Sequence, residues 1–125
     1  MKVRLRFGLE KFYLCDRIEF NDSLRYADVA EDVAHLAMDL DFHGRRDLRR
    51  HFISAYMLQS EDEDLEDVVY FWMCYKSCVR VKVSLFRVKN LDKTTNDSDG
   101  RRKIKKAEEE ATNHLKLAES YLELL

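Results

Sequence analysis

Residues 13–44, YLCDRIEFNDSLRYADVAEDVAHLAMDLDFHG, contain the change of periodicity that decides the fold. The stretch begins inside FYLCDRIEF (12–20), a segment that we interpret as a strand. From about Leu24 the apolar residues recur at steps of three and four, which is the period of an amphipathic helix. Gly44 follows the last of these residues, and glycine commonly ends helices. The stretch therefore predicts a strand that leads into a helix over about 24–44.

The residues before this stretch predict a second strand. Polar and apolar side chains alternate over residues 2–7, KVRLRF, which is the period of a half-buried strand. Gly8 then opens the segment GLEK, which we interpret as a turn. The first twenty residues are accordingly expected to form a β-hairpin.

The residues after the stretch predict three more helices. Their expected ranges are about 46–60, 65–90 and 101–125. The helix over 65–90 is apolar around most of its surface, which favours a central helix with neighbours on several sides. In the last helix, Leu115, Ala118, Leu122 and Leu125 alternate steps of three and four, which suits packing against another helix.

These elements predict a mainly α fold with an N-terminal β-hairpin, in one domain over 1–125. Within that domain we expect the hairpin at 1–20, a helical core at 24–90, a linker at 91–100 and a C-terminal helix at 101–125. The linker is expected because the segment KTTNDSDG is rich in turn residues and poor in apolar ones.

Composition narrows the class of protein. Hydrophobic residues make up 46% of the chain and charged residues 37%, which is typical of a globular protein. The 22 basic and 24 acidic residues nearly balance, so nucleic acid is not expected as a partner. The apolar runs are too short to cross a bilayer, so no membrane partner is expected either. The odd number of cysteines, three, argues against a secreted disulfide framework and predicts a cytoplasmic location.

Two side-chain groups could carry chemistry, and we weigh each against a structural role. Cys74 and Cys78 lie one helical turn apart, as two zinc ligands would, but their apolar surroundings favour two core cysteines. His35 falls within an apolar helix and is expected to be packed rather than catalytic. The basic run at 44–50, GRRDLRR, could bind phosphate, but a solvated helix face is the expected role.

The stretch also resembles a known family. It is similar to the aminoglycoside phosphotransferase-like kinase superfamily, in particular to the branch often fused to a P-loop ATP-binding domain. The resemblance is dense over about thirty residues and is carried by DxIEFN at 16–21, then RxxDVxxD at 25–32, then AMDL at 37–40 and a glycine at 44. The segment EEEATNHLKLAESYL (108–122) is also similar to the closing helix of that domain. The resemblance implies that the chain is the helical C-terminal subdomain of a protein-kinase-like fold.

The resemblance also implies roles for single residues. Asp16 matches the aspartate that holds Mg²⁺ on the nucleotide phosphates. The other matching polar residues are expected to support the motif structurally, and Asp28 and Asp32 in particular to cap the helix start and fill its first turn. These residues are Glu19, Asn21, Arg25, Asp28 and Asp32.

The sequence departs from the family at the residues that perform catalysis. It contains neither the His-Gly-Asp of the catalytic loop nor the GxxxxGK[ST] of a P-loop, and the N-terminal lobe has no counterpart. We therefore assign no catalytic residue and expect no cofactor for the chain alone. Mg²⁺, bound by Asp16, and ATP are expected only if another chain supplies the missing lobe.

Three functions follow from this departure. The first is a truncated phosphotransferase-like domain that is not catalytic alone. The second is one half of a split small-molecule kinase, completed by a complementary kinase-lobe chain. The third is a helical interaction module, or a homodimer.

Overall fold

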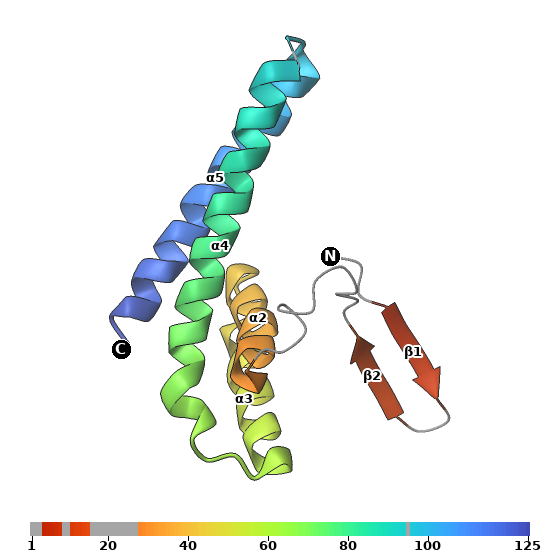
Figure 1. Ribbon diagram of the computed structural model, residues 1–125, viewed down its shortest axis with the longest axis vertical. Helices are drawn as coiled ribbons and strands as arrows, with labels where there is room; N and C mark the ends of the chain where they lie inside the picture. The colour runs from red at the N-terminus through yellow and green to blue at the C-terminus, as the bar shows by residue number, and fades with distance from the viewer. Residues whose placement is uncertain (1–3, 9–10, 16–27, 95) are drawn as a thin grey trace.

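A computed structural model describes residues 4–8, 11–15, 28–94 and 96–125, and the side-chain surroundings of 28–93 and 96–125 (Figure 1). Two strands precede the helices. β1 (Arg4–Gly8) and β2 (Lys11–Cys15) pair antiparallel, with Phe7 opposite Phe12. Residues 16–20 of the expected second strand lie outside the described residues.

The first helix, α2 (Val29–Phe42), begins later than the expected residue 24. Asp28 has an extended backbone, with φ −60° and ψ 136°, and its side chain accepts a hydrogen bond of 2.9 Å from the backbone N–H of Ala30. This is the geometry of a helix N-cap, which places the start of the helix at the next residue. Gly44 has a φ of +73°, the left-handed conformation in which glycine ends helices without steric cost.

The other three helices also form. α3 (Arg46–Ser60) has the expected bounds, and α4 (Leu65–Thr94) has the expected start. The expected linker at 91–100 is mostly helical, because α4 continues to Thr94 and α5 (Ser98–Leu122) begins at Ser98. Asp97 caps α5 by accepting a hydrogen bond of 2.7 Å from the backbone N–H of Gly100, so the turn between the two helices is short.

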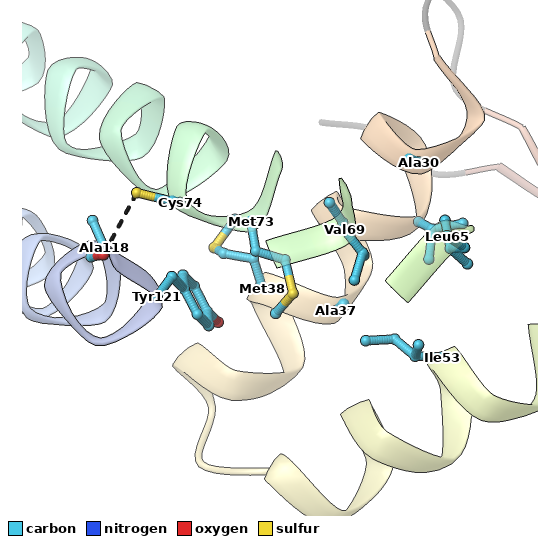
Figure 2. Close-up of a cluster of buried hydrophobic side chains, with 12 residues drawn as sticks. Ala30, Ala37, Met38, Ile53, Leu65, Val69, Met73, Cys74, Ala118 and Tyr121 are labelled. Carbon is cyan, nitrogen blue, oxygen red and sulfur yellow. Dashed lines mark hydrogen bonds between the residues drawn. The ribbon is translucent and has the colours of Figure 1, made fainter. Parts of the chain in front are cut away.

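The helices pack around one core. α4 and α5 form a long antiparallel pair, and α2 packs against α3, α4 and α5 (Figure 1). Ala37 and Met38 of α2 lie fully buried against Val69 and Met73 of α4, and Tyr121 of α5 closes the core from the side (Figure 2). The C-terminal half of α4 runs beyond the ends of α2 and α3 with α5 beside it (Figure 1).

The predicted fold class, a mainly α fold built with an N-terminal β-hairpin, is wrong for the body of the protein. The body that holds this core is all-helical: residues 28–94 and 96–125 form four helices with no strand among them. The pair β1–β2 makes a separate two-stranded sheet and adds no strand to the helical body. The helical body is therefore a four-helix arrangement, and the described residues do not show a kinase-like fold.

The packing surfaces of two helices also differ from expectation. α4 was expected to have neighbours on several sides, yet Phe71, Leu85 and Phe86 are each more than half exposed. On α5 the leucines of the expected stripe, including Leu115 and Leu122, are exposed. The buried residues of α5 are mostly small and include Ala118 of the expected stripe: Gly100, Ala107, Ala111, His114, Ala118 and Tyr121.

Candidate functional site

A buried polar cluster joins all four helices. It consists of Asp41 on α2, Arg49 on α3, Tyr70 on α4 and Tyr121 on α5. The Nε of Arg49 donates to Oδ1 of Asp41 at 3.1 Å, and the hydroxyl of Tyr121 donates to Oδ2 at 2.7 Å. The Nη1 of Arg49 donates to the hydroxyl of Tyr70 at 3.1 Å. One carboxylate and one guanidinium thus connect all four helices, including α2 and α5, whose Asp41 and Tyr121 are 80 positions apart.

The electrostatics of the cluster favour a structural role. The side chains of Arg49 and Asp41 are only 8% and 5% exposed. Burial opposes the charge of Arg49, but the hydrogen bond and the attraction from Asp41 outweigh burial and raise its pKa. Burial raises the pKa of Tyr121 well above its usual value, and its hydrogen bond to Asp41 raises it further. Because both carboxylate oxygens are engaged and the charges are enclosed, the cluster holds the helices in place.

A buried histidine, His114, lies on α5, the helix that also carries Tyr121 of the cluster. The His114 ring stacks on the Phe42 ring, with centroids 3.9 Å apart, and its Nδ1 lies 2.8 Å from the carbonyl oxygen of Glu110. A carbonyl only accepts, so Nδ1 carries the proton and donates. Burial lowers the pKa of His114, and the nearby charge of Arg80 lowers it further. These surroundings therefore favour the neutral imidazole over the charged form.

The motif that resembles the kinase superfamily lies only partly within the described residues. Asp16, Glu19, Asn21 and Arg25 lie outside the described residues, so the Mg²⁺ ligand stays a prediction. Asp28 is the N-cap of α2, and Asp32 lies exposed in the first turn of the same helix. These are the positions that favour acidic residues in any helix.

The two cysteines lie in different surroundings. The expectation that both belong to the core is wrong for Cys78, which is exposed. Cys74 is buried, its Sγ lies 3.5 Å from the carbonyl oxygen of Ala118, and burial raises its pKa. Across 28–93 and 96–125, the side chains that the structure describes include no group of three or more residues suited to hold a metal ion.

The basic run at 44–50 is only partly solvated, as Arg49 shows. Arg45 and Asp47 form an exposed ion pair of 2.9 Å, and this hydrogen bond lowers the pKa of Asp47 to about 2. Arg49 instead turns inward to Asp41, a residue that the sequence analysis did not consider. A signal for Asp41 was present, because it follows Ala37 and Met38 at steps of four and three and so occupies a buried position of α2.

An apolar stripe lies on the side of α4 turned away from the core. We call it the outer face of α4, and it consists of Val68, Phe71, Tyr75, Cys78, Lys82, Leu85, Phe86 and Lys89. Exposed fractions reach 53% at Phe71 and 54% at Phe86. The part from Cys78 to Lys89 lines an open depression. Large exposed apolar patches occur at sites that bind proteins, membranes or ligands, and in proteins that aggregate.

Beyond the core, where α4 lies beside α5, the buried residues of α4 are small. Ser77 and Ser84 are buried on α4, and they lie within the region where Ala107, Ala111 and Ala118 are buried on α5. Small side chains let two helices approach closely but bury little apolar area. In this part of α4, the large side chains of Leu85 and Phe86 are more than half exposed.

Comparisons with known proteins give relatives without a described function. The chain is 43% identical over 74 residues to "Uncharacterized protein Rv2004c" of Mycobacterium tuberculosis and to "Uncharacterized protein Mb2027c" of Mycobacterium bovis. The match covers 59% of this chain but 15% of each relative, so the chain spans a small part of the length of these relatives. No model of a protein family matches the chain, and no solved structure matches it. None of the helices in the described part of the chain has the length and apolar character needed to cross a membrane.

Proposed function

We propose that this chain is a non-catalytic helical interaction module that binds another polypeptide through the outer face of α4. The observation that carries the proposal is the exposure of large apolar side chains along the outer face, while the residues buried in α4 beyond the core are the small Ser77 and Ser84. The free energy of burying Phe71, Leu85 and Phe86 is then available to a partner and not to the fold itself. The absence of His-Gly-Asp from the sequence supports the non-catalytic part of the proposal.

Site-specific photocrosslinking in cells tests this proposal. A photoreactive phenylalanine analogue is placed at Phe71 or at Phe86, and in a matched control at Leu58 of α3, which is 85% exposed and off the outer face. We expect a crosslinked polypeptide from the two outer-face positions and none from Leu58. An outer face that stays uncrosslinked, or crosslinks no more than Leu58, contradicts the proposal.

The second candidate is half of a split small-molecule kinase of the aminoglycoside phosphotransferase-like type. It is supported by the motif around Asp16 and by relatives that are much longer than the match. In this case a complementary kinase lobe would complete the domain, and Asp16 would hold Mg²⁺ on ATP. Calorimetric titration of the chain with ATP and Mg²⁺, alone and with a candidate lobe, tests it. Binding that Asp16→Ala abolishes would favour this candidate over the interaction module.

The location of the protein is part of the same proposal. We place it in the cytoplasm, where its thiols stay reduced. The exposed thiol of Cys78 and the odd number of cysteines support this location.

A further inference from the structure

The outer face of α4 has the spacing of a coiled-coil seam. Phe71, Tyr75, Cys78, Lys82 and Leu85 follow one another at alternating steps of four and three. Helices with apolar residues at this spacing pack along their length against a second helix, with side chains of one fitting between those of the other. The described residues supply no such second helix on this side, because α5 lies against the other side of α4.

The two ends of α4 carry mostly opposite charges, although the acidic Asp92 lies among the basic residues of the C-terminal end. Asp64 and Asp67 lie at its N-terminal end, and Lys89 and Lys93 lie near its C-terminal end. None of the ion pairs described for 28–93 and 96–125 uses any of the four. A parallel neighbour of the same kind would place acid against acid and base against base. An antiparallel one would place each acidic end against a basic end.

A second copy of the chain supplies both a second helix for the seam and an antiparallel order of charges. An antiparallel pair of α4 helices related by a two-fold axis between Cys78 and Val79 brings complementary residues together. The facing pairs are Asp64 with Lys93, Val68 with Lys89, Phe71 with Phe86, and Tyr75 with Lys82. Two of these pairs join opposite charges or an ammonium with an aromatic ring, and the other two cover apolar side chains.

We infer that the outer face of α4 binds a second copy of this chain, antiparallel, as a two-fold homodimer. The inference rests on the proposed function, since it names the partner of the same face. Lys82 already lies over the ring of Phe86 within one chain, with its Nζ 5.8 Å from the ring centroid. This contact places the lysine on the outer face, where it can meet Tyr75 of the second copy.

Sedimentation equilibrium of purified variants tests the inference. The unaltered chain is expected to have twice its 14.9 kDa mass. Reversing one end, with K89E and K93E or with D64K and D67K, places like charges together and raises the dissociation constant by about ten-fold, since each dimer contains the altered contacts twice. Reversing both ends in one chain restores opposite charges and the original affinity. Reversal of the exposed Lys105 and Lys106 on α5 is the matched control and leaves the mass unchanged.

The outcomes separate this inference from the proposed function. In a parallel dimer, like ends of α4 face each other in every variant. Reversing either end, or both, would therefore leave its dissociation constant unchanged, which contradicts the antiparallel arrangement. A monomer at all concentrations, or a failure of the double reversal to restore the dimer, overturns the inference. If photocrosslinking at Phe71 still yields an adduct with a different polypeptide, the proposed function stands while the second copy is excluded. Circular dichroism of each variant confirms that the helices are retained.

Discussion

Replacing Arg49 with methionine tests whether the buried polar cluster holds the four helices together. The methionine side chain fills much of the same space but removes the charge that faces Asp41. The carboxylate of Asp41, only 5% exposed, would then keep its hydrogen bond from Tyr121 and lose its counter-ion. Leaving one charge of a buried pair without its partner costs about 3–5 kcal/mol of unfolding free energy. Since small proteins are stable by about 5–15 kcal/mol, this loss is a large share of the total.

Urea unfolding followed by circular dichroism measures this loss. With a slope of about 2 kcal/mol per molar urea, the midpoint of R49M is expected to fall by about 2 M. The matched control is R45M, which breaks an ion pair of the same chemistry between exposed side chains and is expected to leave the midpoint unchanged. Replacing both partners, with R49M and D41L, should recover much of the loss because no unpaired charge remains. The reasoning is refuted if R49M loses no more stability than R45M.

Three further predictions concern single residues. Burial lowers the pKa of His114 from its usual 6.5, so the unfolded chain binds the proton first as pH falls. Its contribution to stability is therefore full above about pH 6.5 and is lost as pH falls below that, and urea unfolding at pH 5 and 7.5 should show a smaller decline in H114Q. Gly44→Ala should cost about 1 kcal/mol and lower Tm, because the left-handed backbone is strained for alanine although no atom obstructs its Cβ; an unchanged Tm would contradict this. In a Cys15→Ser background, a thiol reagent should label Cys78 rapidly and Cys74 only on unfolding, and equal rates by mass spectrometry would show that Cys74 is not buried.

The sequence predicted the helices well where capping or chain-breaking residues mark their ends. Gly44 separates α2 from α3, and the acidic segment after Ser60 separates α3 from α4, so these bounds were close. Asp28 and Asp32 were predicted together to cap the helix start and fill its first turn, and the prediction did not distinguish which residue does which. The role of Asp28 as the N-cap became clear from the hydrogen bond to Ala30, which depends on backbone angles that the sequence does not specify.

The packing of α4 could not be predicted because apolar residues surround the helix. When every side is apolar, periodicity does not show which side meets the core. The choice follows from small residues instead: Ser77 and Ser84 allow α5 to approach, and the larger Phe71 and Phe86 remain outside. The same preference places alanines and not leucines in the buried stripe of α5.

The buried cluster was missed because charge was taken as a sign of exposure. Arg49 stands among four other charged residues at 45–50, and only its partner across the chain distinguishes it from them. Asp41 and Tyr121 are 80 positions apart, so their contact depends on the tertiary fold. The motif residues at 16–25 stay predictions, since they lie outside the described residues.

The length of α4 has a consequence for how the protein opens. Its N-terminal half shares the core and the polar cluster with three other helices, whereas its C-terminal half lies beside α5 over a seam of serines and alanines (Figure 1). Amide protons on one continuous helix should then exchange with solvent at two rates, slowly near Val69 and Met73 and faster beyond Ser84. The two halves of α4 would then belong to two cooperative unfolding units. A polypeptide bound to the outer face would slow hydrogen exchange in the C-terminal half.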